Sequence, residues 1–253
     1  MALPPYYSNL GPFRELFLTG QPILTYHHVG KRPRGARLKG LYVSPRLFAR
    51  QLVELLAAGF SMPPFQQIAA GLPCPPRPVF LTFDDGFRDV FDHALPVLRR
   101  GDCHSIVFLL SDLLGRSNEW QQRAGDRVEL LMDAAQVREW LAAGHEIGSH
   151  SRTHPRLTQL APEAAREEIT ASKKALEDRF GRLVAHFCYP YGDWNDRVRE
   201  LVIEAGYTTA CTTEPGINTA ATDRFALRRV TARYRSRNWK NLWTALWRGW
   251  KTP

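Results

Sequence analysis

The sequence has no run of apolar residues that could cross a bilayer, which takes about 18 in succession. Its first residues include neither a basic segment nor an apolar one, so we expect no secretory signal peptide and a cytoplasmic location. The cysteines form no C-x-x-C pair, and reduced thiols are the simplest expectation for Cys74, Cys103, Cys188 and Cys211. These absences argue against a membrane-spanning protein and against a disulfide-rich secreted one.

Acidic residues are absent after Asp223. The chain has 34 lysines and arginines against 25 acids, a formal net charge of +9. Nine bases follow Asp223, so this last stretch holds the whole formal excess of positive charge. They are Arg224, Arg228, Arg229, Arg233, Arg235, Arg237, Lys240, Arg248 and Lys251.

The same stretch is rich in tryptophan, with Trp239, Trp243, Trp247 and Trp250 among the seven of the chain. At about 100° per residue these four lie on one face of a helix, with bases on the other. Residues 236–253 are therefore predicted to form a basic, amphipathic C-terminal helix. Such a helix either contacts a membrane at its inner face through Trp239–Trp250, or packs on the domain with its bases solvated. The chain has no recognisable nucleic-acid motif, and we expect no nucleic acid partner.

Apolar strand-like runs alternate with helical patterns along the rest of the chain. This alternation favours an α/β fold, with a mostly parallel sheet and helices outside it. We expect a single domain, a distorted (β/α) barrel whose site lies at the C-terminal ends of the strands. Strands are predicted near residues 22–27, 79–83, 105–110, 146–149, 185–189, 207–212 and 225–231. Helices are predicted at Pro45–Ala58, Ala134–Ala143, Pro162–Phe180 and from about Asn195 to before Gly206, with residues 117–128 as a loop.

Two motifs follow predicted strands, T-F-D-D-G at residues 82–86 and H-S-R-T-H at residues 150–154. Either motif alone has an ordinary explanation, because Asp-Asp-Gly often forms a turn and His-x-x-x-His often lies on a helix surface. Together they supply one carboxylate and two imidazoles, an open ligand set for a divalent metal such as zinc. The second carboxylate is then left free as a base. The pair of motifs predicts metal-dependent hydrolase chemistry.

In this order the two motifs resemble those of the polysaccharide deacetylases (carbohydrate esterase family four), over about residues 21 to 231. The resemblance implies a seven-stranded (β/α) barrel that binds one divalent metal. Zinc is the first expectation, and cobalt, nickel or iron would also suit these ligands. It further implies that Asp84 is the general base and that Asp85, His150 and His154 hold the metal.

The family's third block, usually F-R-P-P-Y-G, corresponds here to F-C-Y-P-Y-G at residues 187–192. The resemblance places Tyr189, Pro190 and Tyr191 on the substrate side, with a backbone N–H near Tyr189 stabilising the oxyanion. Cys188 stands where the family has an arginine that steadies the base. The family's last block usually brings a histidine as general acid, but residues 226–230 read A-L-R-R-V. These blocks therefore leave the general acid unassigned.

A candidate for the acid lies near the N-terminus, where an apolar run ends in His27 and His28, with Gly30 soon after. Some family members, including deacetylases of exported glucosamine polymers, resemble this chain in a Y-H-x-V motif here and in an F-x-Y-P-Y-G block. His27 is then the expected general acid. The alternative is that one of the two histidines is buried and bonded to backbone while the other is exposed.

The predicted function is removal of N-acetyl (or N-acyl) groups from an amino-sugar glycan or a lipid-linked sugar by a metal-dependent hydrolase. Three alternatives remain: an O-acetyl esterase of a carbohydrate, a glycan-binding pseudoenzyme, and a membrane-associated scaffold that acts through its C-terminal helix. We expect three parts, an N-terminal extension (1–20), the catalytic barrel (21–235) and the basic C-terminal helix (236–253).

Overall fold

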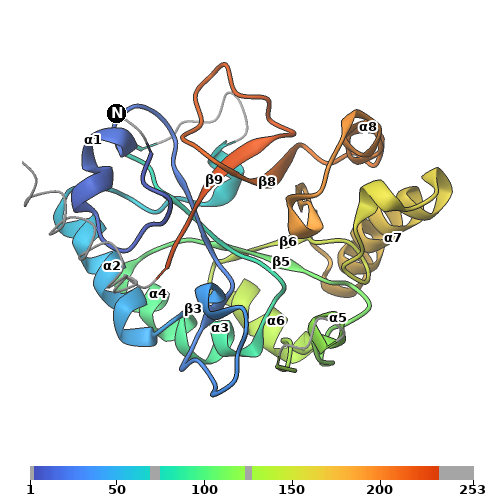
Figure 1. Ribbon diagram of the computed structural model, residues 1–253, viewed down its shortest axis with the longest axis horizontal. Helices are drawn as coiled ribbons and strands as arrows, with labels where there is room; N and C mark the ends of the chain where they lie inside the picture. Colours follow the sequence, from blue (N-terminus) through green and yellow to red (C-terminus); the bar gives the residue numbers. More distant parts are fainter. Residues whose placement is uncertain (1–2, 69–74, 123–126, 234–253) are drawn as a thin grey trace, which may run out of the picture.

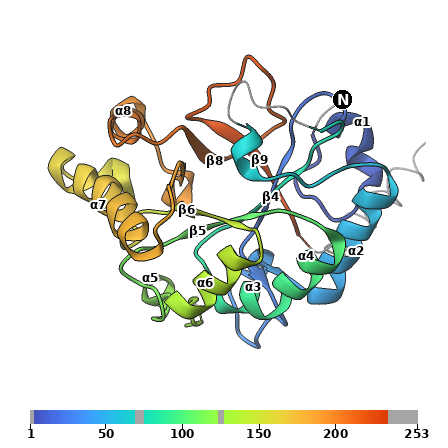
Figure 2. The ribbon, with the colours of Figure 1, turned by 180° about the vertical axis from the view of Figure 1, so that it is seen from behind.

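A computed structural model of the chain describes residues 3–68, 75–122 and 127–233. Seven parallel strands form a closed barrel in the order β1-β4-β5-β6-β7-β8-β9, with helices around its outside (Figures 1 and 2). The predicted fold, a single (β/α) barrel of seven strands, is confirmed. The strands are β1 (Ile23–Tyr26), β4 (Phe80–Phe83), β5 (Ile106–Leu109), β6 (Glu146–Ser149), β7 (His186–Cys188), β8 (Thr209–Pro215) and β9 (Leu227–Thr231).

The strand register brings the ends of four strands to one edge of the barrel. Tyr26 pairs with Phe83, the last residues of β1 and β4. The last residues of β5 and β6, Leu109 and Ser149, also pair, and Ser149 in turn pairs with Phe187 in β7. The residues that come next in the chain therefore meet at the C-terminal edge of the barrel. A parallel sheet places these ends together whatever lies between the strands in sequence.

The four predicted helices are present, and side chains cap three of them as the sequence suggests. Ser44 accepts a hydrogen bond from the Leu47 N–H at the start of α2 (Pro45–Ala57). Asp133 forms a capping box with Gln136 at α6 (Ala134–Ala142). Asn195 caps α8 (Asp196–Glu204), and Pro162 begins α7 (Pro162–Phe180), which ends at Gly181 in a left-handed conformation.

Several short elements of two to seven residues were not predicted, because so few residues carry too little periodicity to be recognised. They include α1 (Arg14–Phe17), α3 (Arg88–His93), α4 (Leu95–Gly101) and the small parallel pair β2 (His28–Val29) and β3 (Tyr42–Val43). The segment predicted as a loop at 117–128 contains α5 (Glu119–Gln122). Prediction of that segment as wholly irregular is therefore wrong.

The interior of the barrel is filled at one end by apolar side chains and carries the polar motifs at the other. A small cluster inside the barrel includes Ile23, Phe80, Ile106 and Phe108, while a larger cluster lies between the strands and the outer helices. The inner cluster fills the interior towards the N-terminal ends of the strands, and the polar motifs follow their C-terminal ends.

The N-terminal segment packs against the barrel. Tyr7 forms a parallel bridge with Ala232 after β9, and the side chains of Leu10, Phe13 and Phe17 are buried in the larger cluster. The predicted Trp-rich helix at 236–253 lies outside the described residues. Among the residues that are described, none of the helices combines the length and apolar character needed to span a membrane.

Candidate metal centre and active site

Asp85, His150 and His154 converge at the C-terminal edge of the barrel. The Nε2 atoms of His150 and His154 lie 3.3 and 3.2 Å from the same oxygen, Oδ1 of Asp85. All three ligand atoms lie within 4.8 Å of one another, and all three side chains are buried. This places the predicted ligands at the spacing that one metal ion requires.

The hydrogen-bond pattern around these residues suits a cation between them. His150 Nδ1 lies 2.6 Å from the Cys188 carbonyl, which can only accept, so Nδ1 carries the proton and Nε2 presents a lone pair. That lone pair faces Asp85 Oδ1, a buried oxygen without a hydrogen-bond partner among the described residues. Two acceptors face each other across a short gap, which is stable only with a cation or a proton between them.

The backbone is held in an uncommon conformation at the ligands. Asp85 and His154 have φ values of 69° and 67°, and Ser151 in the same loop has 71°. Non-glycine residues rarely adopt this left-handed conformation, and when they do, the site is often functional. Gly86 continues the turn at φ 71°, where an added Cβ would lie 2.7 Å from the Leu109 side chain. The T-F-D-D-G motif therefore needs its glycine for space as well as for φ.

Helix α7 fixes the loop between the two histidines. The Glu168 carboxylate accepts hydrogen bonds from the backbone N–H of Arg152 (2.9 Å) and of Thr153 (3.0 Å), and from the Thr153 hydroxyl (2.7 Å). One turn further along, Ser172 donates to the Ser151 carbonyl at 3.0 Å. These bonds tie the loop to a long helix and limit the movement of His154.

Asp84 makes its principal contact with Arg229, a residue that was not among the predicted site residues. The Arg229 guanidinium donates to both oxygens of Asp84, at 2.8 and 2.7 Å, and both side chains are buried. Burial opposes ionisation of Asp84, but the charge and hydrogen bonds of Arg229 outweigh it and lower the pKa of the carboxyl group. Arg229 thus keeps the candidate base ionised and oriented.

Sequence reasoning missed Arg229 because it counted this residue only as one of the nine bases of the C-terminal stretch. The signal that could distinguish it is strand alternation in β9, where Leu227 and Arg229 are buried and Arg228 between them is exposed. Arg229 also donates to the Thr212 carbonyl at 2.8 Å and to the Thr82 hydroxyl at 3.1 Å. These acceptors hold the buried guanidinium of Arg229 in a defined position beside Asp84.

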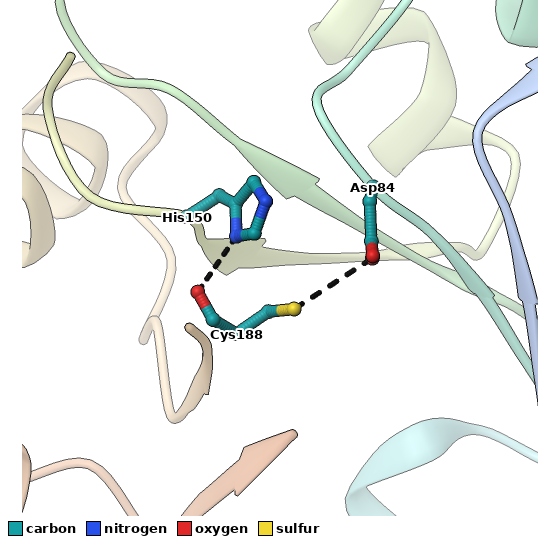
Figure 3. A group of neighbouring side chains, drawn as sticks. All are labelled: Asp84, His150 and Cys188. Atoms are coloured by element: carbon teal, nitrogen blue, oxygen red, sulfur yellow. Dashed lines mark hydrogen bonds between the residues drawn. The ribbon is translucent and has the colours of Figure 1, made fainter. Parts of the chain in front are cut away.

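Cys188 contacts both Asp84, the candidate base, and His150, a candidate ligand (Figure 3). Its sulfur is 3.7 Å from Asp84 Oδ1 and 3.1 Å from Arg229 Nη2, while its carbonyl accepts from His150. Burial raises the pKa of the thiol to about 11, so Cys188 stays protonated. Asp84, His150 and Cys188 form a second possible ligand group, but the adjacent guanidinium disfavours a cation there. Asp85, His150 and His154 are therefore the better candidate ligand group.

His27 lies beside the candidate base, at the end of β1. Its Nε2 is 3.8 Å from Asp84 Oδ2, too far for a hydrogen bond, and its side chain is 19% exposed. His28 points elsewhere: it is buried between Tyr42 and Phe87, with Nδ1 3.0 Å from Asp89. Of the two histidines, only His27 faces Asp84.

The third block contributes in a different way from the one predicted at Tyr189. The Tyr189 N–H donates to the Cys211 carbonyl at 3.1 Å. The hydroxyl of the same tyrosine, whose side chain is buried, donates to the Phe225 carbonyl at 3.0 Å. Pro190 is buried and has no N–H. Tyr191 is 44% exposed and sets its ring against His154, with 4.4 Å between the ring centres. Of the three residues, Tyr191 reaches the metal centre most directly.

The fold and this site define a (β/α) barrel with a candidate metal centre at the C-terminal ends of its strands. Residues 72–210, more than half of the chain, match the family described as polysaccharide deacetylase, and the chain belongs to that family.

Relatives and solved structures agree with this assignment. YxkH of Bacillus subtilis (strain 168) is 28% identical over 152 residues, 60% of this chain and 50% of that protein. A chitooligosaccharide deacetylase of Bradyrhizobium sp. (strain ANU 289) is 27% identical over 136 residues, 51% of this chain and 53% of that protein. The chain thus spans about half the length of these two curated relatives, and it spans less of others, such as 23% of a peptidoglycan-N-acetylglucosamine deacetylase of Listeria monocytogenes.

Among solved structures, the Streptococcus pyogenes deacetylase PplD, in complex with acetate, has a TM-score of 0.72 and 26% identity, covering 85% of this chain and 92% of that one. IcaB from Ammonifex degensii has a TM-score of 0.74 at 23% identity, covering 89% and 96%. The likeness to IcaB supports the fold alone.

Proposed function

We propose that this protein is a metal-dependent hydrolase that removes N-acetyl groups from an amino-sugar glycan or glycan precursor. The observation that carries the proposal is the three-ligand cluster of Asp85, His150 and His154 beside a separate carboxylate, Asp84, held by Arg229. Membership of the polysaccharide deacetylase family supports the substrate class. The acetate bound to PplD supports the reaction type, since acetate is the product of deacetylation.

Asp85, His150 and His154 would hold one divalent metal, with zinc the first choice for this mixture of nitrogen and oxygen ligands. When bound, such an ion polarises the acetyl carbonyl and makes a nearby water more acidic. The three ligand side chains are buried, and they follow the C-terminal ends of β4 and β6. The acyl group therefore approaches from the edge.

Asp84 is the proposed general base. Both of its oxygens are fixed by Arg229, yet each carboxylate oxygen has a further lone pair that can accept a proton from the attacking water. The lowered pKa of Asp84 keeps it ionised in neutral solution. Because Asp84 is next to Asp85 in the chain, the base lies close to the proposed metal site without being one of its ligands.

The remaining roles fall to His27 and the third block. His27, at 3.8 Å from Asp84, is the proposed donor of a proton to the leaving amine. Because the sheet occupies the Tyr189 N–H and Pro190 has none, we assign the oxyanion contact of this block to the Tyr191 N–H. Tyr191 then contacts both His154 and the substrate.

The test is acetate release from N-acetylglucosamine oligomers and from a generic acetyl ester. Protein treated with a chelator should be inactive, and zinc or cobalt should restore release. Asp84→Asn should abolish release while zinc still binds, because the ligand set is intact. Full activity in that variant would contradict the assignment of the base.

The same assay distinguishes the other functions. Without a proton donor, an ester expels an alkoxide, which leaves more easily than the amide anion that an N-acetyl group would have to expel. An O-acetyl esterase therefore depends less on a general acid. If His27 is only a neighbour of the base, the ester alone will be cleaved. A glycan-binding pseudoenzyme would cleave neither substrate while binding both metal and oligosaccharide.

A further inference from the structure

A cavity of 530 Å³ lies beside the metal centre, on the side of His154. We call it the Arg156 pocket. Its walls come from four separate parts of the chain: Leu113 after β5, Trp120 with Glu119 from α5, residues 153–156 and Gln159 after β6, and Tyr191 from the third block. Because His154 forms part of its lining, a sugar whose acetyl group reaches the metal would place a neighbouring residue or substituent in this pocket.

Aromatic rings make up the wall nearest the metal. The Trp120 ring stacks on the His154 ring at 4.8 Å and 26°, and the Tyr191 ring meets His154 at 4.4 Å and 68°. Aromatic surfaces suit the apolar faces of sugar rings. They do not by themselves say whether the sugar is neutral or charged.

The charge of the pocket comes from Arg156. Its guanidinium carbon lies 4.4 Å over the Tyr191 ring, and the residue is exposed. No carboxylate in the described parts of the chain lies within ion-pair distance of it. Arg152, in the same loop, differs in pairing with Asp112 at 2.8 Å and Glu167 at 2.9 Å.

The contact with Tyr191 leaves the N–H edge of Arg156 without a carboxylate partner among the described residues. A guanidinium that lies flat on a ring covers the ring face, while its N–H groups point outward in its own plane. This edge matches two oxygens of a carboxylate or a phosphate. The face of Tyr191 under Arg156 is at the same time closed to a stacking sugar. Recognition at this wall therefore depends on the guanidinium.

The surrounding edge of the barrel adds positive charge. Residues 31–39, after β2, contain five exposed bases and no acid, namely Lys31, Arg32, Arg34, Arg37 and Lys39. The Arg127 guanidinium donates twice to the Arg34 carbonyl, at 3.1 and 2.9 Å, and so joins this loop to the segment after α5. Glu119 is the acid in the pocket lining, and it makes no ion pair with Arg156.

We propose that the Arg156 pocket binds an anionic substituent, a carboxylate or a phosphate, on the sugar next to the one that is deacetylated. The inference rests on the proposed function, because the metal centre fixes where the acetyl group lies. The substrate would then be an acidic amino-sugar glycan or a sugar phosphate, and neutral oligomers would be poorer substrates.

The test compares three trisaccharides of N-acetylglucosamine: the neutral one, one with C6 hydroxyls oxidised to carboxylates, and one with C6 phosphates. With zinc-loaded protein at low salt, we expect kcat/KM to be about fivefold to tenfold higher for an anionic trisaccharide. The advantage should shrink in 0.5 M salt because the attraction is screened over about 4 Å. The carboxylated and phosphorylated arms show which anion is preferred.

Arg156→Gln should remove this preference by lowering kcat/KM for the anionic trisaccharides to that of the neutral one. Arg182→Gln is the matched control, since Arg182 is an exposed arginine outside the pocket. Equal kcat/KM for neutral and anionic trisaccharides in the wild type would overturn the inference and leave the proposed function intact. A preference that persists in Arg156→Gln would also overturn it.

Binding separates this inference from a failure of the proposed function. If no trisaccharide releases acetate, their dissociation constants for zinc-loaded protein are measured by calorimetry. Tighter binding of an anionic trisaccharide, lost in Arg156→Gln, would support the pocket even though the proposed reaction had failed. Equal binding of all three would overturn the pocket as well.

Discussion

At the scale of single residues, the ion pair of Arg229 and Asp84 is the least expected feature of the site. The family has the arginine that steadies the base at the position of Cys188 in this chain. The structure supplies it from β9, across the barrel, with its guanidinium 3.1 Å from the Cys188 sulfur. The two positions therefore project into the same space, and either could direct a guanidinium at the base.

This geometry predicts that Arg229→Gln lowers kcat by about 100-fold, because the base loses its orientation and its compensating charge. It should also lower the free energy of unfolding by about 3 to 5 kcal/mol, since Asp84 remains buried without its partner. Steady-state kinetics and urea unfolding measure the two effects. Arg228→Gln, at the exposed neighbour, should change neither.

A relocation experiment separates position from stability. Cys188→Arg combined with Arg229→Ala should recover part of the lost activity, because the new arginine approaches Asp84 from β7. No recovery in a double variant that folds as well as the wild type would show that the guanidinium must come from β9.

At the scale of elements, α7 acts as the support of the metal loop. Glu168 and Ser172 lie one turn apart on the helix and hold the backbone of residues 151–153. A carboxylate that accepts three hydrogen bonds from one loop fixes the position of His154 without touching the metal. This is a positioning role that a motif search does not reveal.

Glu168→Ala is therefore expected to weaken zinc binding by about tenfold or more, because outer contacts of this kind orient the ligands. Competition with a chromogenic chelator measures the affinity directly, without need of a substrate. Glu163→Ala, an exposed acid in the first turn of the same helix, is the control. Unchanged zinc affinity in Glu168→Ala would contradict the role of α7.

At the scale of the whole molecule, buried histidines make the fold sensitive to acid. Burial, and then the charge of Lys173, lowers the pKa of His186 to about 4. Burial also lowers the pKa of His145 to about 4, with smaller contributions from His104 and Arg99. An unfolded histidine has a pKa of about 6.5, so between pH 6.5 and 4 the unfolded chain binds more protons than the folded one.

Stability should therefore be complete above about pH 6.5 and fall as the pH is lowered towards 4. Each of these histidines should cost about 2 kcal/mol between pH 7 and pH 5. Urea unfolding at the two pH values measures the loss. His186→Asn should show a smaller loss than the wild type, whereas His93→Asn, at an exposed position, should match it. Equal losses in all three proteins would exclude His186 as a cause.

The sequence by itself determined the barrel and the residues that gather at the candidate metal centre. Seven apolar runs alternate with helical patterns, and the parallel arrangement forces the ends of those runs to one edge. Asp84, Asp85, His150 and His154 directly follow such runs or lie within one turn of them, so local sequence was enough to place them together. Those positions depend only on strand direction and register.

Only the tertiary structure decided which charged residues act on these. Positions 228 and 229 both hold arginine. The pairing of β9 with β1 and β8 leaves Arg228 exposed and buries Arg229 against Asp84. Glu168 and Arg156 acquire their roles from contacts with the loop 151–153 and with Tyr191, which the folded chain brings to them. The sequence specifies the chemical type of each side chain at each position. The direction in which the side chain points depends on how the whole barrel closes.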